Sequence, residues 1–496
     1  MRDKEQRAGM PRKKSLAVNY LLNTSCQIFL LAVPLITTPY LSRTLGAGGV
    51  GVYSYTYAMV SYFLLFAVLG TNTYGQRAIA YVQDDKYLRS CRFFEILAVR
   101  LLAAAVCSLA YLFYILTPFC KYRPVAWIQI LWLAGTALDL SWLFQGLEDF
   151  KSLVARNALA RVLHVVLLCG CIRSPSDVRK YALILSGVSL LASLSMWPCL
   201  PKIIGRVKPR DVRPFRDIRE MLVLFVPAVA VQINAVFDKT MIGWFAAGPA
   251  ENGYYEQTEK VVRVALAVVT SLSAVMIPRI AKLYQDRRTG QIRDLLGKSY
   301  QFVWFAGIPA MLGLLAVMDL FVPVFYGPGY ERMEALMPVY LLYMIPVALS
   351  NVTGCQFLIP TRRQNVYTAA VAVGAAVNVL CNCLLIPRFQ AGGAVAASVL
   401  AEYAGAVILL AYVQKNKLVE LSAVFSGSLK KWAAGAGMFL CVRWTGTLLD
   451  ASAGSLALLI LEGAAVYAAL LFLQKDSFAL WIAAAAAGKV HGMLPR

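Results

Sequence analysis

The stretch VNVLCNCLLIPRFQAGGAVAASVLAEY, residues 377–403, consists of two apolar runs with a break between them. Pro387 and Arg388 form the break, and a proline favours the end of a helix because it has no backbone N–H to donate. Asn378 and Asn382 lie one helical turn apart within the first run, where most other residues suit lipid. The pattern predicts two membrane-crossing helices, the first with a polar stripe that needs an explanation.

The rest of the chain has the same character. Its 496 residues are 59% hydrophobic and only 15% charged, whereas soluble domains carry about 25% charged residues. Mean hydropathy is +0.63, and runs of about 20 apolar residues recur, each long enough to cross ~30 Å of hydrocarbon. We therefore predict an all-α polytopic membrane protein with fourteen transmembrane helices. They are expected at about residues 16–41, 50–70, 94–117, 124–143, 153–172, 181–200, 220–246, 254–280, 300–326, 336–358, 366–386, 392–413, 431–449 and 455–474.

The formal charge of +22 comes from basic residues in short loops between these spans. With the N-terminus in the cytoplasm, about 34 of the 48 Lys and Arg residues fall on the cytoplasmic side, as the positive-inside rule requires. This distribution predicts that both termini are cytoplasmic, and it argues against nucleic acid as a partner. Most cysteines lie inside spans and without zinc-site spacing, so we expect no metal site.

The densest basic stretch, PKIIGRVKPRDVRPFRDIRE (201–220), divides the chain into two halves of six spans. Val33-Pro34 in the first half matches Val226-Pro227 in the second, which predicts two pseudo-symmetric six-helix lobes related as parallel repeats. Two such lobes suit alternating access. The predicted parts are an N-terminal tail (1–15), an N-lobe (16–200), a basic linker (201–219), a C-lobe (220–413), two further helices (431–474) and a C-terminal tail (475–496).

Charged residues within spans are the main functional signal, because a charge at a helix centre costs about 2.5–3.5 kcal/mol on insertion scales. Arg161 shares one helix face with Asn157 and His164. The candidates for substrate binding are Arg161, Arg263, Arg100, Lys239 and Lys260, with Arg43 and Arg77 at the two mouths of a cavity. Candidates for ion coupling or charge pairing are Asp238, Asp139 and Glu148. Asn378, Asn382, Asn157 and Asn234 are candidates for lining the cavity or for packing.

Polar stripes occur in both halves, which indicates a water-filled, net-basic cavity. Arginine binds phosphate through bidentate hydrogen bonds and lysine through its point charge, so the implied cargo is a phosphate or pyrophosphate. Glu256–Lys260 and Glu259–Arg263 are also spaced as i,i+4 ion pairs. The alternative that these charges pair internally or reach to the interface stays open, and so does packing rather than sugar contact for the asparagines.

Several local strings resemble the bacterial polysaccharide exporters, the oligosaccharide-lipid flippases of the multidrug/oligosaccharidyl-lipid/polysaccharide (MOP) exporter superfamily. The opening stretch resembles their NxxLNxxLIPxxGxxGAAxA region, with Gln390 standing where the family often has glycine. WLFQGLEDFKSLVARN (142–157) resembles their FQGxExfK segment. The strings TPYLSRTLGAGGVGVYSY (38–55), FDKTMIG (237–243) and GYYEQTEKV (253–261) extend the resemblance over spans one to twelve.

The resemblance implies a bacterial plasma-membrane protein with two six-helix lobes around a central cavity and two additional helices. It implies a non-enzymatic function, which is to flip a polyprenyl-diphosphate-linked oligosaccharide from the inner to the outer leaflet for surface polysaccharide export. The implied partners are that lipid-linked substrate, the bilayer, and polysaccharide polymerases and glycosyltransferases. No cofactor is expected, and Na⁺ or H⁺ coupling is left open.

Four alternatives remain at this point. A lipid II flippase and a cation-coupled multidrug exporter belong to the same superfamily, although a drug exporter would favour an acidic, aromatic-lined pocket. A membrane-embedded polysaccharide polymerase is a third alternative, but it would need a large outside loop, which the sequence does not predict. An acyltransferase would need a catalytic histidine, and of the two histidines, His164 falls within a span and His491 in the tail.

Overall fold

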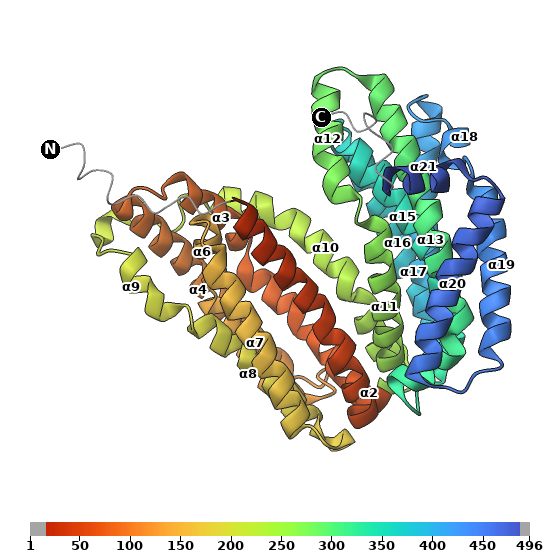
Figure 1. The fold of residues 1–496 in the computed structure, drawn as a ribbon. Helices are drawn as coiled ribbons and strands as arrows, with labels where there is room; N and C mark the ends of the chain where they lie inside the picture. The colour runs from red at the N-terminus through yellow and green to blue at the C-terminus, as the bar shows by residue number, and fades with distance from the viewer. Residues whose placement is uncertain (1–15, 487–496) are drawn as a thin grey trace. The chain divides into compact units, whose positions relative to one another are not determined.

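The computed structural model describes residues 16–486 as a succession of helices (Figure 1). Side chains are described from residue 34 onward except at 35, 227, 228, 230, 231, 233–235, 485 and 486. Residues 16–486 contain no β-strand, so the all-α prediction is confirmed for this part of the chain.

Eleven helical stretches among the described residues are long and apolar enough to cross a membrane, so the chain is a multi-pass membrane protein. The count of fourteen stays a prediction. The span predicted at 431–449 corresponds to helix α19 (Ser428–Gly446), which is not among the eleven. Lys430, Lys431 and Arg443 lower its hydropathy, and the Lys431 ammonium is buried against Asp476 at 3.0 Å.

The helices form two compact units. The first comprises residues 16–45 and Tyr55–Phe237, and the second Gly46–Ser54 and residues 238–486. Besides parts of α2 (Leu16–Val68) and α10 (Ile218–Phe245), the first unit contains α3 (Thr71–Tyr81), α4 (Lys86–Leu116), α5 (Arg123–Leu138), α6 (Ser141–Gly146), α7 (Phe150–Cys171), α8 (Val178–Leu194) and α9 (Leu200–Ile203). The pseudo-symmetric lobes and their boundaries stay a prediction.

The second unit contains the remaining helices. They are α11 (Pro249–Thr270), α12 (Ser273–Gln285), α13 (Thr289–Tyr326), α14 (Arg332–Leu341), α15 (Met344–Ser350), the π-helix η4 (Asn351–Leu358), α16 (Gln364–Phe389), α17 (Ala391–Lys415), α18 (Leu421–Val424), α19, α20 (Ala453–Leu473) and α21 (Ser477–Ala486). The span predicted at 336–358 is thus divided into α14, α15 and η4.

Helix α2 differs from the two separate spans predicted at 16–41 and 50–70. Its residues are helical on both sides of Gly46, and only this glycine has non-helical backbone angles, with φ +65° and ψ 174°. Glycine adopts positive φ at little cost because it has no Cβ. The predicted loop is therefore a one-residue break.

The predicted helix end at Pro387 is displaced by two residues. Helix α16 continues through Pro387 to Phe389 and ends at Gln390, whose φ is +56°. A positive φ favours glycine, so the glutamine at this position holds a backbone conformation that side chains rarely adopt. In this chain the Gln390 side chain accepts a hydrogen bond from the Ala247 backbone N–H at 2.6 Å, which ties the turn to the end of α10.

The first unit positions α5, α6 and α7 around a shared core. Helix α5 packs on α4 and α8, α7 packs on α8, and α6 packs on α3. The Trp142 ring of α6 is fully buried and stacks on Phe93 with centroids 5.7 Å apart. A Cβ on Gly75 would lie 2.6 Å from that indole, so the glycine makes room for it. This packing holds the α5–α6 connection, where Asp139 lies.

Two glycines of the second unit lie in direct backbone contact. A Cβ on Gly51 would lie 1.7 Å from the Pro249 carbonyl oxygen, and one on Gly253 would lie 2.0 Å from the Ala47 carbonyl oxygen. The segment Gly46–Ser54 and the start of α11 therefore approach more closely than side chains allow.

Gly253→Ala should destabilise the protein by at least about 1–3 kcal/mol, because the backbone on both sides must shift to admit a methyl group. Thermal unfolding of the purified protein in detergent measures this loss. Gly187→Ala is the matched control, since no atom lies within 4 Å of its Cβ position and alanine favours the interior of α8. Equal melting temperatures for both variants would contradict the close approach.

Candidate functional site: a basic cavity and two charged clusters

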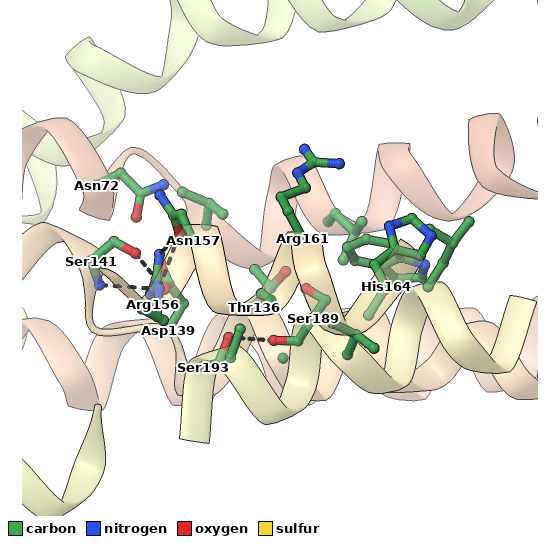
Figure 2. A pocket seen from close by; sticks show the side chains of 18 of the residues that line it. Asn72, Thr136, Asp139, Ser141, Arg156, Asn157, Arg161, His164, Ser189 and Ser193 are labelled. Carbon is green, nitrogen blue, oxygen red and sulfur yellow. Dashed lines mark hydrogen bonds and ion pairs between the residues drawn. The ribbon is translucent and has the colours of Figure 1, made fainter. Parts of the chain in front are cut away.

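A cavity of about 500 Å³ opens within the first unit, between α2, α4, α5, α7 and α8. Figure 2 shows its polar side chains arriving from several of these helices. They are Asn72, Arg100, Thr136, Asp139, Ser141, Arg156, Asn157, Arg161, His164, Ser189 and Ser193. Arg161, Arg100, Asp139 and Asn157 were all predicted site residues, and this cavity brings the four together.

Arg100 lines the cavity, with only 1% of its surface exposed. Its Nε donates to the Thr136 carbonyl oxygen at 2.8 Å, and its Nη1 donates to Asn72 Oδ1 at 2.6 Å. Carbonyls in the last turn of a helix lack intrahelical partners, and α5 ends at Leu138, so Arg100 caps this helix. Its guanidinium is thus occupied by structural contacts.

Asp139 connects two arginines at the end of α5. Its Oδ1 accepts from Arg156 Nη1 at 3.0 Å, and its Oδ2 lies 3.8 Å from Arg100 Nη2. The Ser141 hydroxyl also donates to Oδ1, at 2.5 Å. Figure 2 shows Arg156, Ser141 and Asp139 gathered in this group. One carboxylate therefore offsets two guanidinium groups and holds both in place.

Arg161 has a different environment. It is exposed and lines the cavity, and among the described residues it forms no hydrogen bond or ion pair. In Figure 2 its side chain points away from the group around Asp139. Three arginines and a single aspartate leave the cavity lining with a formal excess of two positive charges. An anion of charge −2 matches it, and Arg161 is the guanidinium with donors to spare.

His164 lies one turn beyond Arg161 on α7 and is half-buried. Its Nε2 is buried without a hydrogen-bond partner among the described residues. Asn157 is exposed, and its Oδ1 accepts from the neighbouring Arg156 Nη2 at 2.9 Å. The face of α7 predicted from the sequence does line the cavity.

Sequence reasoning missed Arg156, Asn72 and Ser141. Arg156 was detectable, because it lies within the family-like string 142–157 and directly before Asn157. Its role depends on Asp139, seventeen residues away and beyond the turn after α6. Asn72 and Ser141 are ordinary polar residues near helix ends, and nothing in the sequence marks them.

The predicted cations of the second unit are paired with glutamates. Lys239 Nζ lies 2.5 Å from Glu256 and 3.0 Å from Glu259. Lys260 pairs with Glu256 at 3.0 Å, and Arg263 pairs with Glu259 at 2.7 Å, which confirms the two predicted i,i+4 pairs on α11. Lys239 is 16% exposed, whereas Arg263 is 54% exposed. The cluster carries three cations and two carboxylates, so its excess charge is small.

Asp238 lies beside this cluster in a separate buried network. Its carboxylate accepts from the hydroxyls of Tyr255 and Ser398 at 2.7 and 2.6 Å, and from Asn382 Nδ2 at 2.6 Å. Asn382 also donates to Asn378 at 3.0 Å, and its own Oδ1 is buried without a described partner. The two asparagines of the opening stretch therefore serve as internal hydrogen-bonding groups in this structure.

The other predicted site residues lie outside these groups. Arg43 is exposed on α2, and Arg77 forms an ion pair with Glu220 with 42% of its side chain exposed. Glu148 is exposed in the turn after α6, at φ +56°. The side chain of Asn234 lies outside the described residues.

Two family models match the chain over overlapping ranges. A model described as polysaccharide biosynthesis protein matches residues 16–284, and one described as lipid II flippase MurJ matches residues 165–461. A relative from Escherichia coli K12, named "Putative O-antigen transporter", is 23% identical over 392 residues, which cover 78% of this chain and 94% of the relative. A protein of the same name from Shigella dysenteriae is 22% identical over 77% of this chain and 95% of its own length.

Solved structures show the same fold. The lipid II flippase MurJ in an inward closed conformation has a TM-score of 0.68 and 16% identity, covering 92% of this chain and 99% of that one. An inward-facing multidrug resistance MATE family transporter has a TM-score of 0.58 and 12% identity, covering 80% and 95%. Both family models match more than half of the chain, the two relatives are named as O-antigen transporters, and the solved flippase and transporter structures share the fold. The chain therefore belongs to the polysaccharide biosynthesis protein family, within the MOP exporter superfamily, and is a flippase of that superfamily.

Proposed function

We propose that the protein flips a polyprenyl-diphosphate-linked oligosaccharide from the inner to the outer leaflet of a bacterial plasma membrane for surface polysaccharide export. The observation that carries the proposal is the basic cavity of the first unit, where three arginines face one carboxylate. A diphosphate supplies the two negative charges that the lining lacks, and Arg161 binds it through a bidentate pair.

In this proposal the protein alternates between inward-open and outward-open states and catalyses no chemical reaction. The sugar crosses through water, while the polyprenyl tail remains in lipid. We propose that the chain crosses the membrane fourteen times and that both termini are cytoplasmic. Glycosyltransferases would supply the substrate, and a polymerase would consume it.

The proposal is tested by locating lipid-linked oligosaccharide in a strain that lacks the protein. Substrate should accumulate on the cytoplasmic side, protected from a periplasmic glycosidase, and should become accessible when the protein is restored. If substrate reaches the outer side in the deletion strain and merely stays unpolymerised, the protein is a polymerase and the proposal fails.

Lipid II is a second candidate cargo, because the MurJ model matches residues 165–461 and lipid II also presents a polyprenyl diphosphate. Depleting the protein separates the two cargoes: surface polysaccharide should be lost while cell-wall synthesis continues. Cell lysis on depletion would favour lipid II. A multidrug exporter would extrude cationic dyes, which a net-basic cavity disfavours.

We further propose that Asp238 couples transport to Na⁺ or H⁺. The carboxylate of Asp238 is in contact with the hydroxyls of Tyr255 and Ser398 and with the amide of Asn382, and hard cations prefer such oxygen ligands. The unpartnered Asn382 Oδ1 has an acceptor site left for such an ion.

Asp238→Asn should therefore abolish the dependence of flipping on the coupling ion, because the amide carries no charge to neutralise. Flipping in proteoliposomes is measured with a Na⁺ gradient at constant pH and with a pH gradient without Na⁺. Asp84→Asn, at an exposed turn of the first unit, is the control and should behave like the wild type. A variant that responds to both gradients as the wild type does would contradict the coupling role.

A further inference from the structure

Two adjoining cavities lie near the N-terminal end of α13, in the second unit. One, of about 450 Å³, has mainly apolar walls from α12, α13 and α21. They include Met276, Leu295, Phe302, Phe478 and Trp481. The other, of about 520 Å³, is polar, and its lining includes Arg293, Gln301, Lys417 and Glu420. Asp294 and Lys298 line both cavities, so the apolar and the polar space meet at these two residues.

The paired cavities carry an excess of positive charge. Arg279, Arg293, Lys298 and Lys417 line them, against the two carboxylates of Asp294 and Glu420. Among the described residues Lys298 forms no ion pair, and its ammonium lies 5.2 Å from the centre of the Trp481 ring. Arg293 donates to the Lys417 backbone carbonyl at 3.2 Å rather than to a carboxylate. The cations at the junction thus keep their attraction for an anion.

We propose that the two cavities together bind one anionic phospholipid of the surrounding bilayer. Its phosphodiester lies in the polar cavity against Lys298 and Arg293, and one acyl chain lies in the apolar cavity. The apolar cavity runs alongside two stretches able to cross a membrane, Pro249–Gln285 and Thr289–Tyr326, so acyl chains are at hand. Trp481 lines the apolar cavity with its ring 5.2 Å from the Lys298 ammonium, and tryptophan is enriched at headgroup level.

The positive excess selects the class of lipid. An anionic headgroup gains from each cation near the membrane surface, whereas the ammonium of a zwitterionic headgroup is repelled by the same cations. This binding site is independent of the cavity around Arg161 and of the cargo proposed above, because all its lining residues belong to the second unit.

The proposal is tested by native mass spectrometry of the purified full chain. Phosphatidylglycerol and phosphatidylethanolamine with identical acyl chains are added at equal concentration, and the retained lipid is counted. Phosphatidylglycerol should be retained preferentially, and Lys298→Gln should lower its affinity about fivefold, the value expected for one cation at a membrane surface. Lys151→Gln, an exposed lysine of the first unit, should leave retention unchanged. Arg293→Gln provides a second variant if Lys298→Gln folds poorly.

A second measurement locates the acyl chain. Phosphatidylglycerol with brominated chains should quench tryptophan fluorescence, and Trp481→Phe should remove part of that quenching. The proposal would be overturned if phosphatidylglycerol and phosphatidylethanolamine were retained equally. It would also be overturned if Lys298→Gln and Arg293→Gln both retained phosphatidylglycerol as the wild type does. It would also be overturned if inorganic phosphate displaced the lipid completely, or if polyprenyl phosphate bound and phosphatidylglycerol did not.

Discussion

Replacing Arg161 by alanine should lower the rate of oligosaccharide flipping tenfold or more. Arg161 is the cavity arginine with no described partner, so its donors are available to the substrate's diphosphate. A hydrogen bond to a charged group contributes about 1.5–3 kcal/mol, and each 1.4 kcal/mol is a factor of ten. The measurement is surface polysaccharide in a deletion strain that expresses the variant, normalised to the amount of protein in the membrane.

Two further variants make this result specific. Arg161→Lys keeps the positive charge but loses the planar guanidinium that forms bidentate hydrogen bonds. Its flipping rate should therefore lie between those of Arg161→Ala and the wild type. Arg179→Ala removes an exposed arginine of α8 that does not line the cavity, and it should flip at the wild-type rate. A normal amount of surface polysaccharide in a strain with a well-expressed Arg161→Ala variant would contradict the assignment of Arg161 to the substrate-binding site.

Replacing Lys239 by methionine should destabilise the folded protein by about 3 kcal/mol. Lys239 is largely buried and pairs with both Glu256 and Glu259, and removing one partner of a buried ion pair costs about 3–5 kcal/mol. The loss should lie at the low end, because Glu256 keeps Lys260 and Glu259 keeps Arg263. At about 1 °C for each kcal/mol, the value that the per-residue unfolding entropy gives for 496 residues, the melting temperature should fall by about 3 °C.

The charge-preserving variant Lys239→Arg tells a structural role from a role in transport. Its guanidinium can still pair with Glu256 and Glu259, so thermal stability should recover relative to Lys239→Met. If Lys239→Met instead melts like the wild type in detergent but has lost flipping, the lysine acts on the substrate, and the ion pairs described for it do not hold the fold.

Much of this architecture was predictable because it depends on local sequence. The hydrophobic runs predicted helices because a backbone in lipid must satisfy its own hydrogen bonds. Helical spacing predicted the Glu256–Lys260 and Glu259–Arg263 pairs and placed Arg161 on a polar face, and the structure agrees. The family-like strings also predicted the superfamily, which the family models confirm.

The local sequence pattern gave wrong helix boundaries where the backbone conformation of a single residue determines whether a helix continues. A loop was predicted between the first two spans, but the flanking residues are helical and only Gly46 breaks the helix. A proline was expected to end the helix at 387, yet α16 ends at Gln390. Pro387 loses the hydrogen bond that its own N–H would donate to the carbonyl four residues earlier, and only two helical residues follow it, so little of the helix is affected.

By itself, the sequence determined where most of the helices lie, which face of α7 is polar, and to which superfamily the chain belongs. Only the tertiary structure decided which of the charges are occupied. Asp139 holds Arg156 and lies close to Arg100, and Lys239 joins two glutamates of the next helix, while Arg161 keeps its donors. The reason is physical: periodicity places a side chain on its own helix, whereas its partner depends on how neighbouring helices are rotated and how deep each one lies.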